Sequence, residues 1–328
     1  MRVPMLITAF LVHIFAMPVA VQAGQARAVP EVGFLGVIPR PDYDEAKDPF
    51  KAAFIDGLRA LGYVEGKNIH VAWPVPRKPE DIAAMAADLV DRKVDVIATV
   101  GPQSIEAVRR ATTTIPIVII ACDRADKLVN SIARPGGNIT GMACISSDLA
   151  LKRLQLMQQV LPGLSHLAVL FNGGVPAKVA ELQDVTAAAK TLEVDVHSAD
   201  VRNASEFTTA FAAIKAGNPD GLLIFSDPLT FLHVKEIANF AAEQRLPSMF
   251  GFREFCDVGG LLSYGANLKH QFRRYGYFID KILKGTKPGE IPIEEPITHE
   301  LVVNARTAKL LGLSIPNSIL VGADEVIE

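Results

Sequence analysis

Short runs of apolar residues alternate along most of the chain with longer stretches whose apolar residues recur every three or four positions. The first pair is EVGFLGVI, which is rich in β-formers, followed by a stretch with Phe50, Phe54, Leu58 and Leu61 at helical spacing. A run that is apolar throughout is typical of a strand buried on both faces, and the wider spacing is typical of an amphipathic helix. The pattern predicts a strand followed by a helix.

The same alternation fills two successive regions. In the first region, strands are predicted at NIHVAW, VDVIATV and IPIVIIAC, each followed by a helical stretch, of which the last is DKLVNSIA. The pattern then restarts with the long helix SDLALKRLQLMQQVLP and continues through HLAVLFN, VDVHSADV, GLLIFSD and PSMFGF with helices between them. Strands separated by helices form right-handed βαβ units and hence parallel sheets. The expected fold class is α/β, with two doubly wound, Rossmann-like lobes.

Three crossings between the lobes are predicted, which would make a three-strand hinge. The turn at residues 135–138 would direct the next segment into the second lobe, although an ordinary helix-to-strand loop has the same turn chemistry. GGLLSYGANL would cross back, and HELVVN would cross a third time. The expected division is residues 29–141 plus 266–290 for the first lobe, and 142–265 plus 291–328 for the second.

The first residues of the chain have a different pattern. Arg2 precedes a long apolar stretch broken by Pro18, and the small residues Val21 and Ala23 follow it. These are the marks of a secretory signal peptide, which we expect over residues 1–28 and which would place the mature protein in the periplasm. A retained membrane anchor is the alternative, because the apolar run approaches the ~18 residues that span a bilayer.

Length and charge limit the classes of partner. With 328 residues and 49% hydrophobic composition, the chain can bury two cores, since a domain takes roughly 100–200 residues. The net charge of −3 provides no broad basic field, so nucleic acid is not an expected partner.

Motifs of catalysis and metal binding are missing from the sequence. The three cysteines, Cys122, Cys144 and Cys256, have neither zinc-site nor redox spacing, and none follows the apolar run as a lipid anchor. The seven histidines show no paired metal-ligand spacing. No GxSxG, HExxH, GxGxxG or P-loop motif occurs. We therefore expect no catalytic residue, no metal and no cofactor.

Candidate binding residues follow from a rule of open α/β sheets, which bind ligands beyond the carboxyl ends of their strands. After VDVIATV, the turn from Gly101 to Ser104 opens a helix whose free N–H groups suit a carboxylate. After GLLIFSD, Asp227 can pair with an ammonium group. Ser104 and Asp227 can equally serve as helix caps.

Weaker candidates lie at other strand ends, where Asn172 can donate to a carboxylate and aromatic residues can stack on a ring. The full set of predicted ligand-binding residues is Gly101, Gln103, Ser104, Asp123, Asn172, Asp227, Phe252 and Tyr264. Trp73 at the rim and Arg40 after the first strand are further possibilities, with edge packing and a solvated loop as their alternatives. The strand ends show no acidic cluster, which disfavours charged sugars and polyamines.

Several stretches resemble one family in the same order along nearly the whole mature chain. TTTIPIVI, ARPGGNITG, LPGLSHLAVLFN, RLPSMFGFREFCDVGGLLSYGANL and TAKLLGLSIPNSILVGADEVIE closely resemble the bacterial ABC-transporter substrate-binding proteins that include tryptophan- and tyrosine-binding members. The resemblance implies a periplasmic binding protein type I-like fold, which closes two lobes on a small solute. It also implies a monomer that delivers its solute to a membrane permease.

The resulting expectation is a periplasmic solute receptor of an ABC importer. Its solute would be small and carboxylate-bearing: an aromatic or branched amino acid, or an aromatic acid. The alternatives are an extracytoplasmic sensor subunit, which would pass ligand occupancy to a membrane receptor, and a secreted enzyme built on the same two lobes.

Overall fold

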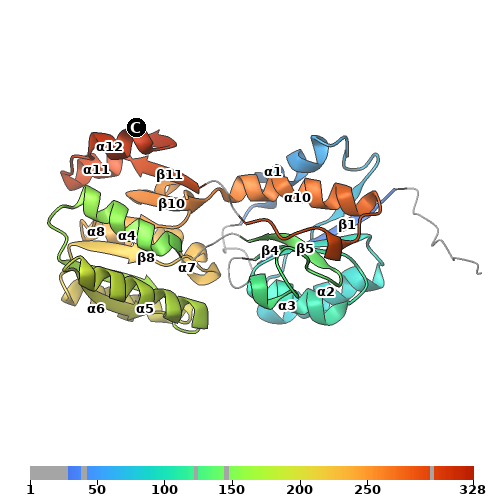
Figure 1. Ribbon diagram of the computed structural model, residues 1–328, viewed down its shortest axis with the longest axis horizontal. Helices are drawn as coiled ribbons and strands as arrows, with labels where there is room; N and C mark the ends of the chain where they lie inside the picture. Colours follow the sequence, from blue (N-terminus) through green and yellow to red (C-terminus); the bar gives the residue numbers. More distant parts are fainter. Residues whose placement is uncertain (1–28, 38–42, 122–124, 144–147, 296–298) are drawn as a thin grey trace, which may run out of the picture.

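The chain folds into two α/β lobes that lie side by side along the long axis of the molecule (Figure 1). A computed structural model describes residues 29–37, 43–121, 125–143, 148–295 and 299–328. The predicted signal peptide, Arg40, Asp123, Cys122 and Cys144 lie outside the described residues. Within the part of the chain that is described, none of the helices combines the length and apolar character needed to cross a bilayer.

The first lobe is built on a five-stranded parallel sheet with strand order β2-β1-β3-β4-β5. Its strands are β1 (Glu31–Leu35), β2 (His70–Ala72), β3 (Val96–Val100), β4 (Ile117–Ala121) and β5 (Ile139–Ala143). Its helical segments are α1 (Pro49–Arg59), α2 (Pro79–Asp91), α3 (Pro102–Ala111), α10 (Leu268–Leu283) and the 3-10 turns η1 (Glu45–Lys47), η2 (Ala125–Lys127) and η4 (Pro288–Glu290). The strands predicted from the first four apolar runs are confirmed.

Helices cover both faces of this sheet. Phe34 of β1 packs with Phe54 of α1 and Tyr275 of α10, whereas Ile97 of β3 packs on the opposite face with Leu89 of α2. Successive side chains of a strand point to opposite faces, so burial of both faces requires apolar residues throughout the strand. This requirement explains the unbroken apolar runs in the sequence.

The second lobe contains a seven-stranded sheet with strand order β12-β11-β10-β9-β8-β6-β7. Its strands are β6 (His166–Phe171), β7 (Asp195–Asp200), β8 (Gly221–Ile224), β9 (Ser248–Phe250), β10 (Leu262–Ala266), β11 (His299–Asn304) and β12 (Glu325–Ile327). Its helical segments are α4 (Asp148–Val160), α5 (Pro176–Thr191), η3 (Ala204–Glu206), α6 (Phe207–Ala216), α7 (Pro228–Leu232), α8 (Val234–Glu243), α9 (Glu254–Asp257), α11 (Ala305–Leu311) and α12 (Asn317–Gly322). Leu154 of α4 and Val185 of α5 pack in one core cluster, and Phe207 of α6 and Ile237 of α8 pack in another that also includes residues of the first lobe.

Two strands of the second sheet depart from the predicted parallel arrangement, since β11 is antiparallel to β10 and β12 is parallel to β11. The reason is the path of the chain, which leaves the second lobe at the end of β10, forms α10 in the first lobe, and returns at the start of β11 (Figure 1). A strand that leaves and a strand that returns at the same edge of a sheet must run in opposite directions. Before returning, the chain pairs with β5, where Ala143 N–H donates to the Glu294 carbonyl at 2.8 Å.

The turn at residues 135–138 does not carry the chain into the second lobe, which corrects the prediction for this turn and the lobe boundary after residue 141. The turn leads into β5, whose five residues all pair with β4 in the first sheet. The first crossing therefore lies between Ala143 and α4. Gln271 of α10 holds the end of β5 in place, because its Nε2 donates to the Ala143 carbonyl at 2.7 Å.

The helix predicted at DKLVNSIA is also wrong, because residues 128–134 form turns and bends after η2. Ser131 Oγ accepts from the N–H of Arg134 at 3.0 Å and donates to its carbonyl at 3.1 Å. Asn130 N–H donates to the Pro135 carbonyl at 3.0 Å. These local hydrogen bonds replace the helical ones, as short polar side chains commonly do.

Helices α1 and α10 pack unusually closely at two glycines. A Cβ placed on Gly57 would lie 2.0 Å from the Arg273 carbonyl oxygen, and one on Gly276 would lie 2.5 Å from the main chain of Gly57. Alanine at either position would push the helices apart. The two glycines therefore set the distance between these helices.

We expect Gly57→Ala to lower the free energy of unfolding by about 1–3 kcal/mol through overpacking. Alanine alone would favour the helix by about 1 kcal/mol, so a loss isolates the packing effect. Denaturant titration measures the change. Gly163→Ala is the control, because nothing lies within 4 Å of a Cβ at that position. Equal stabilities of the two variants would contradict close packing at Gly57.

Candidate functional site

A cavity of about 500 Å³ opens between the two lobes. The first lobe contributes the ends of β1 and β3 and the start of α1, and the second lobe contributes residues of α7, α8 and α9. The lining includes Val37, Val100, Phe50, Phe231, Glu254 and Val258. The cavity therefore lies where the carboxyl ends of parallel strands meet, as the rule for α/β sheets predicts.

Aromatic rings from both lobes line this cavity. Trp73 stacks on Phe34 with ring centroids 3.8 Å apart, and Phe50 lies 4.9 Å from Phe272. Across the cavity, Phe50 approaches Phe231 of the second lobe, with centroids 6.1 Å apart. Trp73 therefore combines the two roles considered for it, edge packing and lining of the rim, because it packs on β1 and lines the cavity.

The polar lining is mainly acidic, which the strand ends had not indicated. It comprises Asp44, Lys47, Asp48, Glu254 and Asp257, together with the Tyr43 hydroxyl. Asp48 is held within the protein, because one oxygen accepts from Phe50 N–H at 2.8 Å and the other from Tyr43 at 3.0 Å. Burial, and after it the charge of Asp48, raises the pKa of Tyr43. The Tyr43 hydroxyl therefore stays protonated at neutral pH.

Glu254, the first residue of α9, is the least satisfied of these acids. Both of its carboxylate oxygens are shielded from solvent and have no hydrogen-bond partner among the described residues. Burial raises its pKa to about 7, and the charges of Asp257 and Glu300 act in the same direction. A lining residue whose carboxylate lacks a partner is available to a positively charged group in the cavity.

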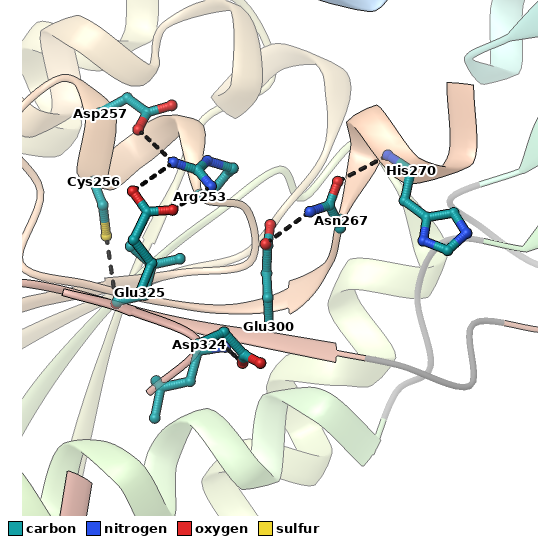
Figure 2. Close-up of polar contacts among 10 residues, drawn as sticks. Arg253, Cys256, Asp257, Asn267, His270, Glu300, Asp324 and Glu325 are labelled. Atoms are coloured by element: carbon teal, nitrogen blue, oxygen red, sulfur yellow. Dashed lines mark hydrogen bonds and ion pairs between the residues drawn. The ribbon is translucent and has the colours of Figure 1, made fainter. Parts of the chain in front are cut away.

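The neighbouring Arg253 does not neutralise Glu254, because it is engaged elsewhere. Figure 2 shows the Arg253 guanidinium between Asp257 and Glu325, which it contacts at 3.3 Å and at 2.7 and 3.0 Å respectively. The hydrogen bonds to Glu325 raise the pKa of Arg253 further. These contacts tie α9 to β12 and leave Glu254 unpaired.

The predicted candidates after β3 form a rigid turn. Gly101 has a φ of 88°, and a Cβ there would lie 2.3 Å from Val37, so glycine is required. Ser104 is fully buried, and its Oγ donates to the Gly36 carbonyl at 2.6 Å, which ties α3 to the end of β1. Gln103 is exposed. Among the described residues no side chain caps α3, so its first N–H groups are available to an anion.

Asp227 and Asn172 lie close together in the second lobe. Asp227 caps α7, since one oxygen accepts from Thr230 N–H at 2.9 Å, while its buried Oδ2 has no hydrogen-bond partner meeting ordinary geometry. Burial raises the pKa of Asp227, and Thr230, Lys178 and the Asn172 amide oppose that rise. Asn172 also accepts from Gly174 N–H at 2.9 Å. The capping role is established, and the buried oxygen leaves room for a binding role.

A buried ionic cluster adjoins these residues. Lys178 and Glu181 of α5 form an ion pair at 2.7 Å with side chains only 3% and 5% exposed. Arg153 of α4 lies 3.8 Å from Glu181, and its Nε donates to the Tyr264 carbonyl at 2.8 Å. Burial lowers the pKa of Arg153 to about 10, against the effect of Glu181. The Arg153 guanidinium therefore stays charged at neutral pH.

None of the predicted candidates that the structure describes is among the residues that line the cavity: Gly101, Gln103, Ser104, Asn172, Asp227, Phe252 and Tyr264. Phe252 packs edge-on against Phe231 and Phe250, at 5.9 and 5.8 Å between centroids. Tyr264 is half-buried against the core of the second lobe, 5.8 Å from the ring of His299. Phe252 thus supports a ring that lines the cavity, while a direct role for either residue stays a prediction.

The sequence predicted none of the lining residues except Trp73, and the most informative of those it missed are Phe50, Phe231 and Glu254. Phe50 and Glu254 lie in the first turns of helices, and Phe231 is in the short helix α7. All three helices follow strands whose carboxyl ends face the cleft. These lining residues could have been found by treating the first turn of each such helix, as well as the loop before it, as a candidate part of the site.

The comparisons with known proteins now identify the family. The model of the ABC transporter substrate binding protein family matches residues 40–327. This chain belongs to that family. The substrate-binding protein is 25% identical over 301 residues to a tyrosine-binding protein from Clostridioides difficile, with 90% of this chain and 85% of the relative covered.

Solved structures confirm the fold. An ABC domain in complex with L-Trp from Streptococcus pneumoniae matches this substrate-binding protein with a TM-score of 0.81 and 21% identity, over 91% of this chain and 100% of that chain. A conserved domain protein from Vibrio cholerae matches with a TM-score of 0.81 and 24% identity, over 91% and 99% of the two chains. The predicted class, an α/β periplasmic binding protein type I-like fold, is confirmed.

Proposed function

We propose that this substrate-binding protein is an extracytoplasmic receptor of an ABC importer, which closes its two lobes on an aromatic solute that carries an amino and a carboxylate group. The observation that carries the proposal is the cavity between the lobes, because aromatic rings from both sides line it. A solute that contacts both lobes favours the closed arrangement, since only differential affinity shifts such an equilibrium.

Each part of such a solute has a counterpart in the protein. The ring would pack between Phe50 and Phe231, and the carboxylate would meet the uncapped N–H groups at the start of α3. The ammonium group would pair with Glu254, which lines the cavity and whose carboxylate has no hydrogen-bond partner among the described residues, or with Asp227, which lies outside the lining. The tyrosine-binding relative and the L-Trp complex support this solute class.

Thermal unfolding of the chain from residue 29 onward tests the proposal. We expect tyrosine or tryptophan at ~100 times its dissociation constant to stabilise the native state by about 2.7 kcal/mol. Tyramine, which lacks the carboxylate, and 4-hydroxyphenylpropionate, which lacks the amine, should each stabilise it less. Leucine, 4-hydroxybenzoate and myo-inositol complete the panel. Stabilisation by myo-inositol alone, or by no member of the panel, would contradict the proposed solute class.

Two variants and one analysis locate the site and separate the alternative functions. Asp227→Asn and Glu254→Gln should differ in tyrosine affinity, and the variant with the larger loss identifies the ammonium partner.

Recovery of the solute unchanged after incubation supports a receptor, whereas turnover supports a secreted enzyme. Reconstitution with a permease in vesicles distinguishes import from sensing. We expect the permease to be the membrane partner and the receptor to act as a periplasmic monomer.

A further inference from the structure

Two histidines and an aspartate converge on the surface of the second lobe, away from the cavity. His166 begins β6 and Asp195 begins β7, and the two residues are partners in the parallel register of these strands. His197 lies two positions beyond Asp195 and therefore on the same face of β7. Strand pairing thus brings together residues that show no ligand spacing in the sequence.

The side chains of these three residues meet. His197 Nε2 lies 3.1 Å from Asp195 Oδ2, and His166 Nδ1 lies 4.0 Å from the same oxygen. One ligand atom from each residue lies within 4.8 Å of the others. Within the described parts of the chain, the ion pairs of Asp195 are with these two histidines. No lysine or arginine among those residues competes for its carboxylate.

The main chain beneath this cluster is firmly held. Asp220 Oδ2 accepts from the N–H groups of Ser165 and His166 at 2.9 and 2.8 Å, and Asp220 N–H donates to the His166 carbonyl at 2.8 Å. Asp195 N–H donates to the Ser165 carbonyl at 2.8 Å. Groups carried on strands with fixed main chains hold a ligand geometry better than groups on loops.

We propose that His166, Asp195 and His197 form a binding site for a divalent transition metal ion of the zinc class. Two imidazole nitrogens and one carboxylate oxygen suit Zn²⁺, Ni²⁺ and Co²⁺, whereas Mg²⁺ and Ca²⁺ require oxygen ligands. Tetrahedral ligands of Zn²⁺ lie about 3.3 Å apart. The Asp195 and His197 atoms already have this spacing, and rotation of the exposed His166 ring completes it.

The site is separate from the cavity. His166 and Asp195 lie at the amino ends of their strands, whereas the cavity lies at the carboxyl ends of strands. Metal binding therefore does not depend on the proposed solute. Three protein ligands leave a fourth coordination position open to water or to a group of another molecule.

Calorimetric titration of the untagged chain with Zn²⁺ tests the proposal. We expect one Zn²⁺ per chain, with affinity lowered by more than about tenfold in His166→Ala, in His197→Ala and in Asp195→Asn. The matched control is His70→Ala, because His70 is an exposed imidazole beside a single carboxylate, Glu65, at 3.9 Å. This control should bind Zn²⁺ as the unchanged chain does, and excess Mg²⁺ should not compete.

Cobalt provides a second readout. Co²⁺ bound by this set should give a visible spectrum without a sulfur charge-transfer band, and His197→Ala should lose that spectrum. Circular dichroism should show folded variants, since all three residues are exposed. The proposal is overturned if no saturable Zn²⁺ binding occurs, if both histidine variants bind like the unchanged chain, or if a sulfur band dominates.

Discussion

Glu181→Gln is expected to lower the free energy of unfolding by about 3–5 kcal/mol, the loss typical when one partner is removed from a buried ion pair. Glu181 is only 4% exposed and is paired with Lys178, which is equally buried. Glutamine has nearly the same shape, so the loss reflects charge and leaves packing almost unchanged. The two cations that face Glu181 would remain buried.

The geometry of the cluster explains why its charges cannot rearrange. Arg153 is held by its hydrogen bond to the Tyr264 carbonyl and by close packing, since a Cβ on Gly251 would lie 2.9 Å from its guanidinium. Lys178 retains only the more distant influence of Asp227 once Glu181 is neutral. A buried charge that loses its partner still has its desolvation cost, but it no longer has the attraction that offset this cost.

Denaturant unfolding at neutral pH measures this loss. Glu106→Gln is the matched control, because Glu106 contacts two arginines, Arg109 and Arg110, at the surface of α3. Its loss should be about 0–1 kcal/mol, as for exposed pairs. Adding Lys178→Met to Glu181→Gln should recover part of the stability, because one unpaired cation is removed. A loss at Glu181 no larger than at Glu106 would contradict a buried ionic cluster.

The two-lobed fold could be predicted because its burial leaves a direct trace in the sequence. β3 and β4 are covered on both faces, so both are apolar except for the buried Thr99, and the amphipathic helix between them shows its own period. The place of the first crossing left no such trace. β5 is as apolar as the strands before it, and the turn at residues 135–138 suits either a crossing or a loop.

The position of the cavity could be predicted from the sequence, but most of the residues that line it could not. The strand-end rule placed the cavity at the correct edge of the sheets, but the residues it selected, Ser104 and Asp227, are not among those that line the cavity. Phe50 and Phe231 meet because two lobes are set against each other, and no spacing within either segment encodes that contact. The raised pKa of Glu254 results from its burial, which cannot be recognised without the tertiary structure. His166 and Asp195 are likewise brought together by the register of β6 and β7, which the sequence does not reveal.

Glu254 should make the stability of the solute-free protein fall as pH rises from about 4.5 to about 7. Burial raises the pKa of this group from its ordinary value of 4.5 to about 7 in the folded chain. Between these values the folded state binds more protons than the unfolded state, so stability decreases with increasing pH. The penalty is absent below the unfolded pKa and complete above the folded pKa. Its size is up to about 3 kcal/mol.

Glu254→Gln isolates this effect, because the amide cannot ionise. We expect the variant to match the unchanged chain at pH 4 and to exceed it in stability at pH 8, with the difference growing across the window. Glu243→Gln, at an exposed position at the end of α8, is the control and should show no such difference. A constant difference between pH 4 and pH 8 would mean that folding does not change the pKa of Glu254, and it would contradict the prediction.

The same titration connects stability to the proposed solute. An ammonium group placed against Glu254 favours its ionised form, so the affinity for an amino-bearing solute should rise as pH increases through about 7. The affinity for an analogue without the amine should not rise in this way. Calorimetry of tyrosine and of 4-hydroxyphenylpropionate at pH 6 and pH 8 measures both slopes. If Asp227 binds the ammonium group instead, the affinity for tyrosine falls in Asp227→Asn and is retained in Glu254→Gln.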